Sequence, residues 1–370
     1  MRKRIWKATM KIILIVIIIA VAVLTAGFLF VNFYPSIGKL PDKETKARYA
    51  SITSLFYDDQ FHNENETSVM TDGQSLSGDR RTPSEMIEAE KPTYEEHGAP
   101  GELTFTWFGH SSSMLQLGDR NILIDPVLGK YSSPVTFVGV KRYSECPVSV
   151  DTLPPIDVLF ISHDHYDHLD YATIKGLDNK VANYIVPIGV DVILESYGVS
   201  SDKITALYWW EDTTIDGINY TLTPSQHFSG RNPLKQNPTL WGGLFMRDDS
   251  HSVYYTGDGG YYDVFGQVYE KLGAPDLMLA EDGQYDPTWS SIHMMPEETV
   301  QAALDAHATW LIPVHWGTFV LANHSWDDPA VRATEAAKEN GQNIATPRIG
   351  QTVNYDDISS FTERWWESIR

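Results

Sequence analysis

Three histidines and an aspartate stand within six consecutive residues of this chain: His163, His165, Asp167 and His168. Imidazole nitrogens and carboxylate oxygens are the ligands that zinc and similar borderline metals prefer. The preceding residues, 157–161, are mostly apolar and predict a buried strand that ends at the motif. Histidines on the surface of a polar loop are the alternative, but this spacing directly after an apolar strand favours a metal site.

Three more donors, His227, Asp258 and His315, follow later runs that also predict strands. Those runs are residues 218–223, 253–256 and 310–314. Each donor alone is weak evidence, because a polar residue after a strand is usually an ordinary loop residue. Together with the first motif they make seven donors at the same kind of position. That number is sufficient for two metal ions that share a carboxylate and keep sites open for water.

The elements that must position these donors alternate between strand-like and helix-like segments from about residue 100 to the C-terminus. This alternation predicts one α/β domain of two mixed sheets with helices outside, over residues 101–370. Residues 35–100 are polar and interrupted by prolines, and predict a spacer or a segment that covers the domain. Residues 1–34 form the remaining unit, a basic N-terminus followed by an apolar span.

The apolar span runs from Ile12 to Tyr34 without a charged residue and is long enough to cross a bilayer as a helix. Five basic residues precede it, which predicts a single-pass anchor with the N-terminus inside and the catalytic domain extracytoplasmic. A cleaved signal peptide is the alternative, although its apolar core is usually shorter. The single cysteine, Cys146, excludes an intramolecular disulfide, and a formal charge of −21 makes nucleic acid a poor partner.

The order of the donors resembles the metallo-β-lactamase superfamily, which implies an αββα sandwich with a dinuclear metal site at one edge. Three stretches, at residues 107–111, 161–170 and 315–319, are similar to the N-acyl-phosphatidylethanolamine-hydrolysing phospholipase D group and its bacterial relatives. The likeness covers roughly residues 100–340. It is more specific for the fold than for the substrate, because related lactone hydrolases share the same ligands.

The resemblance implies two Zn²⁺ ions, one on His163, His165 and His227 and the other on Asp167, His168 and His315. Asp258 would bridge the two ions and act in catalysis, where a metal-bound hydroxide attacks the substrate. His293 matches a family histidine that lies over the metal centre, where it would orient substrate or donate a proton. A structural histidine at the entry of a helix is the alternative for His293.

Two further residues are candidates for supporting the ligands. Asp125 ends a predicted strand and is placed to hold the second nitrogen of a ligand imidazole, as metal-bound histidines usually require. A carboxylate that caps the turn before Pro126 is the equal alternative. His110 either faces the site or packs under the turn at residues 111–113.

These observations favour a membrane-anchored zinc hydrolase of a phosphodiester, of the kind found in N-acyl-phosphatidylethanolamine. Hydrolysis of a lactone or other cyclic ester on the same metal site is the alternative. A redox diiron protein of this fold is disfavoured because His163 and His165 are both imidazoles, and a non-catalytic scaffold because the ligand set is complete. The expected partners are a phospholipid or small ester substrate and the membrane; homo-oligomerisation stays open.

Overall fold

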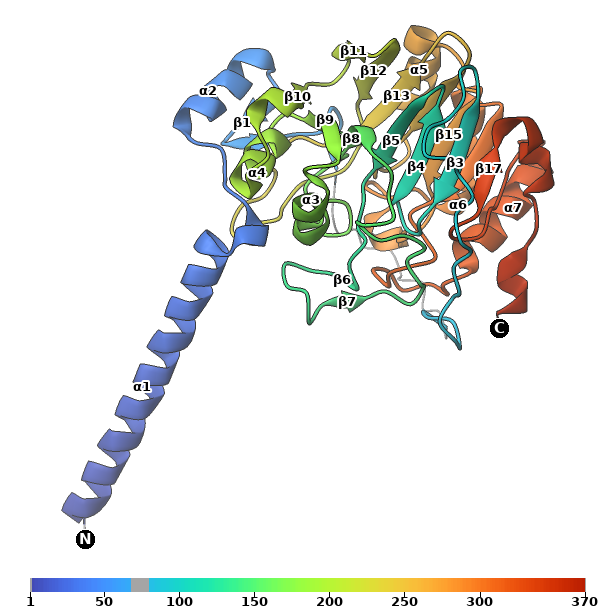
Figure 1. The fold of residues 1–370 in the computed structure, drawn as a ribbon. Coiled ribbons are helices and arrows are strands. Elements are labelled where there is room, and N and C mark those ends of the chain that lie inside the picture. The colour runs from blue at the N-terminus through green and yellow to red at the C-terminus, as the bar shows by residue number, and fades with distance from the viewer. Residues whose placement is uncertain (1, 68–79, 370) are drawn as a thin grey trace.

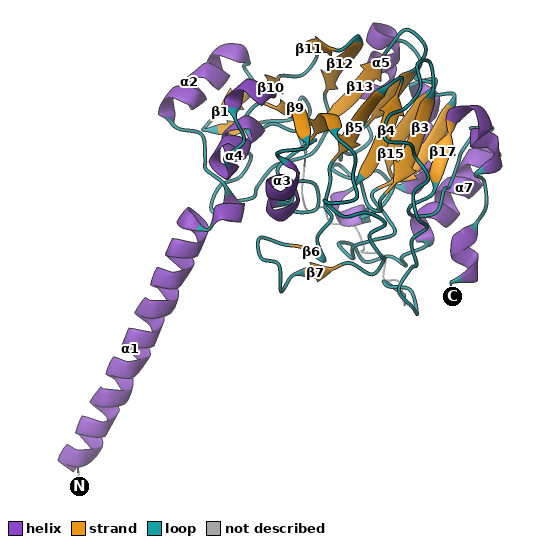
Figure 2. Ribbon diagram, in the orientation of Figure 1, coloured by secondary structure: helices purple, strands orange, loops and turns teal. Residues whose placement is uncertain are grey.

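The computed structural model describes residues 2–67 and 80–369, and in these residues two β-sheets lie face to face with helices on both outer sides (Figures 1 and 2). The first sheet has the strand order β10-β9-β8-β5-β4-β3-β17 and the second has the order β11-β12-β13-β14-β15-β16. The strands of the first sheet are β3 (Leu103–Trp107), β4 (Ser113–Leu117), β5 (Arg120–Ile124), β8 (Ile156–Phe160), β9 (Val181–Pro187), β10 (Ile204–Leu207) and β17 (Thr352–Asn354). Those of the second are β11 (Asp212–Ile215), β12 (Ile218–Thr223), β13 (Gly243–Arg247), β14 (Ser252–Tyr255), β15 (Leu277–Glu281) and β16 (Trp310–Val314).

The helices divide between the two outer faces and the N-terminal region. They are α1 (Arg2–Phe33), α2 (Lys43–Ile52), α3 (Tyr171–Leu177), α4 (Val190–Tyr197), α5 (Val264–Leu272), α6 (Pro296–Asp305) and α7 (Asp328–Asn340). Two short strand pairs lie outside the two sheets, β1 (Phe56–Tyr57) with β2 (Gln60–Phe61) and β6 (Tyr131–Ser132) with β7 (Val140–Lys141).

The strand that leads into the metal motif shows why two sheets form. Along β8, Val158 and Phe160 belong to the apolar core between the sheets, whereas Leu159 and the following Ile161 pack on the outer face with α3 and α4. Side chains alternate across a strand, so a strand with apolar side chains on both faces needs cover on both faces. The second sheet repeats this pattern and packs its outer face against α5, α6 and α7. The αββα sandwich predicted from the resemblance is therefore present.

The strands β12 and β16 agree residue for residue with the runs 218–223 and 310–314 that the sequence predicts. Strand β13 begins at Gly243, because the residues before it bond to loops: Leu240 N donates to Ile188 O (2.9 Å) and Gly242 N donates to Ser162 O (3.1 Å). The irregular segment 35–100 also contains the helix α2, which Asp42 caps by accepting from Thr45 N (2.8 Å).

The described parts of the N-terminal segment contact the domain. Phe61 N donates to Asn237 O (2.9 Å), Ile87 N donates to Tyr143 O (3.1 Å) and Glu90 N donates to Ile349 O (2.8 Å). Helix α1 instead projects away from the sandwich, as Figure 1 shows, and its apolar side chains are exposed. It is the one helix in the described part of the chain that is long and apolar enough to span a membrane, a property that a signal sequence shares.

Candidate metal centre

The loops that follow β8, β12, β14 and β16 meet at one edge of the sandwich and bring the predicted donors together. Asp258 lies at the centre: its Oδ2 is 3.1 Å from His168 Nε2 and 3.2 Å from His315 Nε2. The same oxygen is 3.9 Å from His163 Nε2 and 3.8 Å from His227 Nε2. All five side chains are buried. Asp258 therefore stands between donors from both predicted ligand groups.

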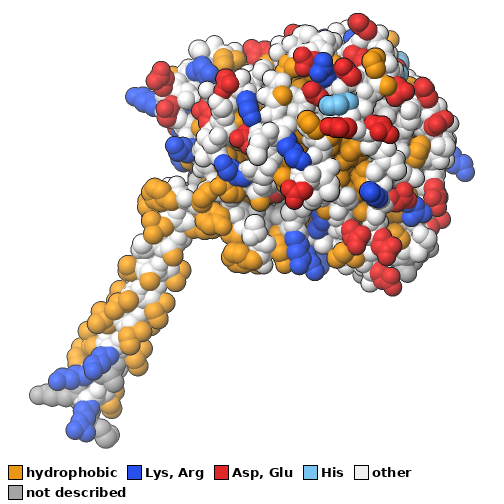
Figure 3. All heavy atoms as spheres, in the orientation of Figure 1, with side chains coloured by type: hydrophobic (Ala, Val, Ile, Leu, Met, Phe, Trp, Pro, Cys, Tyr) orange, Lys and Arg blue, Asp and Glu red, His pale blue; other side chains and the backbone are white. Residues whose placement is uncertain are grey.

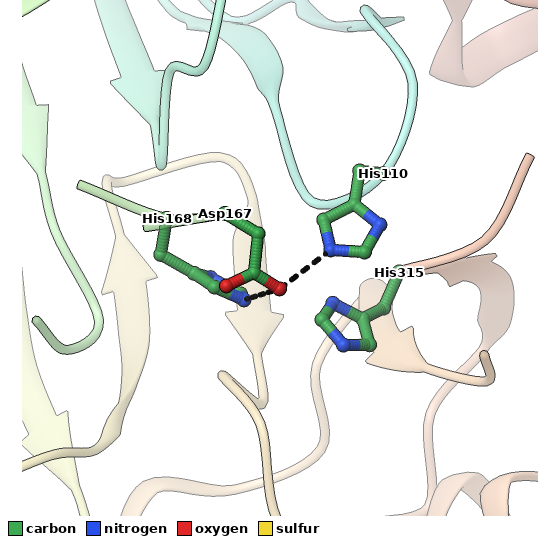
Figure 4. Close-up of side chains that lie close together, drawn as sticks. All are labelled: His110, Asp167, His168 and His315. Atoms are coloured by element: carbon green, nitrogen blue, oxygen red, sulfur yellow. Dashed lines mark hydrogen bonds and ion pairs between the residues drawn. The ribbon is translucent and has the colours of Figure 1, made fainter. Parts of the chain in front are cut away.

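The remaining donors complete two groups on either side of Asp258. In the first, His165 Nδ1 lies 2.8 Å from His163 Nε2 and 3.3 Å from His227 Nε2. In the second, Figure 4 shows Asp167, His168 and His315 converging, with Asp167 Oδ2 3.6 Å from His168 Nε2. In each group the donor atoms lie within 4.8 Å of one another, which is close enough for one ion to contact them all. The structure thus places all seven predicted donors in one cluster.

Four imidazoles direct Nε2 into the cluster because other groups hold their Nδ1 atoms. The partners are Ser162 Oγ for His163 (2.9 Å), Asp125 Oδ2 for His168 (2.7 Å), Ile292 O for His227 (3.0 Å) and Ser111 Oγ for His315 (2.9 Å). A backbone carbonyl or a carboxylate only accepts, so His227 and His168 carry their proton on Nδ1 and keep the Nε2 lone pair for a ligand. This arrangement is typical of metal-bound histidines.

Asp125 follows β5 and is fully buried. Besides His168, its carboxylate accepts from Ser162 N (2.7 Å), Ser162 Oγ (2.6 Å) and the Tyr255 hydroxyl (2.6 Å). Ser162 precedes the metal motif and Tyr255 belongs to the other sheet. Asp125 therefore fixes both the backbone entry of the motif and the orientation of one of its imidazoles.

His110 also faces the site, with Nε2 3.0 Å from Asp167 Oδ2 (Figure 4). Its loop pairs with the loop of His315: His110 N donates to Trp316 O (3.1 Å) and His315 N donates to His110 O (3.0 Å). His110, Asp125 and His315 all have positive φ angles, of 54°, 41° and 69°. Such strained backbone is retained only where the surroundings hold it, and it is often found at functional sites.

His293 lies beside the cluster, with its ring centroid 5.0 Å from that of His227 and 5.5 Å from that of His315. Its Nδ1 is 2.7 Å from Glu281 Oε2, while Glu281 Oε1 accepts from Met294 N (2.8 Å). Glu281 is not among the site residues predicted from the sequence, although a carboxylate directly after the apolar residues 277–280 is a usable signal. Glu281 orients His293 so that the other ring nitrogen faces away from it.

Asn63, in the N-terminal segment, is a second contact that the sequence did not reveal. Its Nδ2 donates to His227 O (2.8 Å) and its Oδ1 accepts from His227 N (3.1 Å). The two residues are 164 positions apart, and no local pattern in the sequence connects them. Asn63 therefore fixes the backbone of a predicted metal ligand from outside the sandwich.

The pKa values of the clustered side chains indicate whether these residues can bind a metal ion. Burial lowers the pKa of His163, His227 and His315 well below the usual value, which favours the neutral form that binds metal. Burial raises the pKa of Asp258 to about 6, and its Oδ1 has no hydrogen-bond partner among the described residues. Burial alone would lower the pKa of His168, but Asp258, Asp167 and Asp125 outweigh it and raise the pKa well above its usual value. The buried carboxylates thus require positive charge, and the residues fit divalent metal ions.

A cavity of about 370 Å³ opens beside the cluster. Its polar wall includes the donors His165, Asp167, Asp258 and His315, together with His293. Its other wall is largely apolar and is formed by Phe228, Trp289, Ile292 and Leu321, with Gln284. A substrate with a polar reacting group and an apolar body would match both walls.

Comparisons with known proteins agree with this fold. A family profile described as the beta-lactamase superfamily domain matches residues 120–316. An uncharacterized protein of Mycobacterium tuberculosis is 40% identical over 261 residues, which cover 70% of each chain. The N-acyl-phosphatidylethanolamine-hydrolyzing phospholipase D 1 of Caenorhabditis elegans is 31% identical over 263 residues, covering 68% of this chain and 74% of the relative. In structure, the isothiocyanate hydrolase from Delia radicum gut bacteria covers 68% of this chain and 98% of its own, with a TM-score of 0.55 and 18% identity.

The chain therefore belongs to the β-lactamase superfamily and is a metal-dependent hydrolase with the metallo-β-lactamase fold. Within that superfamily it is related to the N-acyl-phosphatidylethanolamine-hydrolysing phospholipases D, as the motifs of the sequence predicted.

Proposed function

We propose that the protein is a membrane-anchored dinuclear zinc hydrolase that cleaves the phosphodiester of an N-acyl-phosphatidylethanolamine-like phospholipid. The observation that carries the proposal is the seven-donor cluster beside a cavity with one polar and one apolar wall. The likeness to the phospholipase of C. elegans supports the choice of a phospholipid over other esters.

Two groups of residues in this chain would bind the metal ions, and others would position the substrate. One ion would be held by His163, His165 and His227, and the other by Asp167, His168 and His315, with Asp258 shared. A pair of divalent ions supplies a nucleophile at neutral pH and stabilises negative charge on the reacting group.

Outside the ligand set, His293 is the group best placed to meet the substrate, because it lies on the cavity wall and Glu281 fixes its orientation. The apolar wall with Phe228 and Trp289 would bind an acyl chain and exclude water from the reacting phosphate. The helix α1 would keep the protein at the membrane that contains its substrate.

The test is a substrate comparison with the purified full-length chain in detergent or vesicles, loaded with zinc. We expect release of phosphatidic acid from N-acyl-phosphatidylethanolamine, and about two zinc ions per chain by elemental analysis. A panel of lactones run under the same conditions tests the alternative. Turnover of lactones without cleavage of the phospholipid would reject the phosphodiesterase proposal while keeping the metal site.

A further inference from the structure

The junction between α1 and the domain is held by three separate segments. Ser36, in the turn that follows α1, is buried, and its carbonyl oxygen accepts from Arg231 Nε (2.5 Å) and from the Tyr197 hydroxyl (2.7 Å). Its hydroxyl donates to Pro134 O (2.6 Å), in the hairpin formed by β6 and β7. Asn232 Nδ2 also lies 3.4 Å from Val31 O in α1 itself. The end of the helix is therefore flanked by the β6–β7 hairpin and by the loop at residues 230–237.

Both flanking segments expose large apolar side chains next to this junction. Phe137 and Val138, at the tip of the hairpin, are 74% and 57% exposed, and Leu234 is 71% exposed. Figure 3 shows hydrophobic side chains continuing from the helix onto the domain surface where the two meet. In Figure 1 the hairpin extends from the domain on the side toward which α1 projects. These three residues are called the junction patch below.

The segments that form the junction differ in charge from the rest of the chain. The segments 30–41, 126–144 and 228–247 contain no aspartate or glutamate, although the whole chain has a formal charge of −21. Four exposed lysines lie in these segments: Lys39, Lys130, Lys141 and Lys235. Exposed apolar side chains in segments that also carry exposed lysines are suited to the interface of a membrane with anionic lipids.

We propose that the junction patch inserts into the same leaflet from which α1 emerges, with the four lysines against anionic headgroups. The bilayer is the occupant that the structure favours, because the patch is continuous with the end of a helix suited to span it. Phe33 and Tyr34, at the end of the apolar span, are aromatic residues of the kind that lie at this depth.

The junction between α1 and the domain is also connected to the metal motif. Arg231, which binds the turn after α1, donates from Nη1 to Asp164 O (2.8 Å), and Asp164 Oδ1 accepts from Gly230 N (2.9 Å). Asp164 stands between two predicted metal ligands. This inference rests on the proposed function: a bilayer bound at the patch would present phospholipid close to the loop that carries the metal ligands, so that the lipid need not pass through water.

A probe of membrane depth tests the insertion directly, using the full-length chain in vesicles of phosphatidylcholine and phosphatidylglycerol. In a Cys146→Ser background, Val138→Cys is labelled with an environment-sensitive fluorophore; Tyr269→Cys, at an exposed position on α5, is the matched control. We expect emission at shorter wavelength and quenching by acyl-chain spin labels at position 138 but not at position 269. A probe at position 138 that remains as water-exposed as the control would overturn the proposal.

Hydrolysis rates on a vesicle substrate and on a soluble substrate distinguish a failure of membrane insertion from a failure of the proposed function. With Phe137→Asp and Val138→Asp together, we expect hydrolysis of N-acyl-phosphatidylethanolamine in vesicles to fall about tenfold or more. Hydrolysis of a short-chain, water-soluble analogue should be unchanged, because neither residue lines the cavity of the metal centre. Equal rates on vesicles for the variant and the wild type would contradict insertion. If the wild-type chain cleaves neither substrate, the phosphodiesterase proposal fails, and the fluorescent probe still decides whether the patch inserts.

Discussion

Asp258 is the residue on which the two-ion interpretation depends most directly. We predict that Asp258→Asn lowers the hydrolytic rate by about a thousandfold or more, because an amide is a poor bridging ligand for two cations. The fold should persist, since Asn has nearly the same volume and Asp258 Oδ1 has no hydrogen-bond partner to lose among the described residues. The measurement is turnover with metal content and thermal unfolding of the same preparation. Full turnover in a correctly folded variant would rule out the bridging role.

Glu281 sets which nitrogen of His293 faces the cavity. In its ionised form Glu281 only accepts, so Nδ1 of His293 carries the proton and the other nitrogen presents a lone pair. Burial raises the pKa of Glu281 well above its usual value, so this form is favoured at higher pH. Glu281→Gln offers a donor in its place and should reverse the tautomer, lowering kcat about 10–100-fold with a smaller change in KM.

The matched control for this substitution is Glu298→Gln, because Glu298 caps α6 at Met295 N (2.8 Å) and does not line the cavity. We expect the control to keep its kcat. The double variant Glu281→Gln/His293→Gln should be no slower than His293→Gln alone, since both changes act through one imidazole. Additive losses would show that Glu281 acts by another route.

At the scale of elements, the close approach of two loops at the site depends on Gly283. A Cβ at this position would meet His315 O at 2.1 Å, and that atom belongs to a backbone that His110 also holds. We predict that Gly283→Ala destabilises the fold by about 1–3 kcal/mol or more and lowers metal affinity, because the overpacked loop must displace a ligand.

Gly266→Ala is the control for this prediction. Gly266 lies in α5, and a Cβ there would meet nothing within 4 Å. Alanine in a helix interior should leave the protein unchanged or stabilise it by about 0.5–1 kcal/mol. Denaturant unfolding of both variants measures the difference, and equal stabilities would mean that the loop accommodates the extra carbon.

Local patterns predicted the elements that carry the ligands, but not all of their neighbours. The strands β8 and β16 could be predicted from the sequence, because a strand that is buried on both faces appears there as a run of mostly apolar residues. Asn63 acts through a partner 164 positions away, and a contact of that kind has no local pattern. Glu281 does follow an apolar run directly, but its role depends on the position of His293 in the fold. The edge strand β17 was also missed, since it is three residues long and depends on pairing with β3.

At the scale of the whole molecule, the distribution of charge around α1 predicts its orientation. If the span is an anchor, the basic residues before it predict that the N-terminus lies inside and the metal-centre domain outside the cytoplasm. Protease added to intact cells should therefore remove the domain, with a cytoplasmic protein as the control for lysis. Complete protection of the domain would reverse the proposed orientation. A mature chain that begins beyond residue 34 would instead identify the span as a cleaved signal.

Metal removal tests how far the centre stabilises the molecule, because its ligands come from both sheets. His163, His165, Asp167 and His168 follow β8 of the first sheet, whereas His227, Asp258 and His315 follow strands of the second. Ions that bind only the folded chain stabilise it by mass action, by about 2.7 kcal/mol when free metal is a hundredfold above its dissociation constant. A chelator should therefore lower the unfolding temperature and abolish hydrolysis, and added zinc should restore both.

In Asp258→Asn the chelator should lower the unfolding temperature less, since fewer ions are bound. An unfolding temperature that is insensitive to chelator in the wild-type chain, with activity lost, would mean that the buried carboxylates are accommodated by protonation instead.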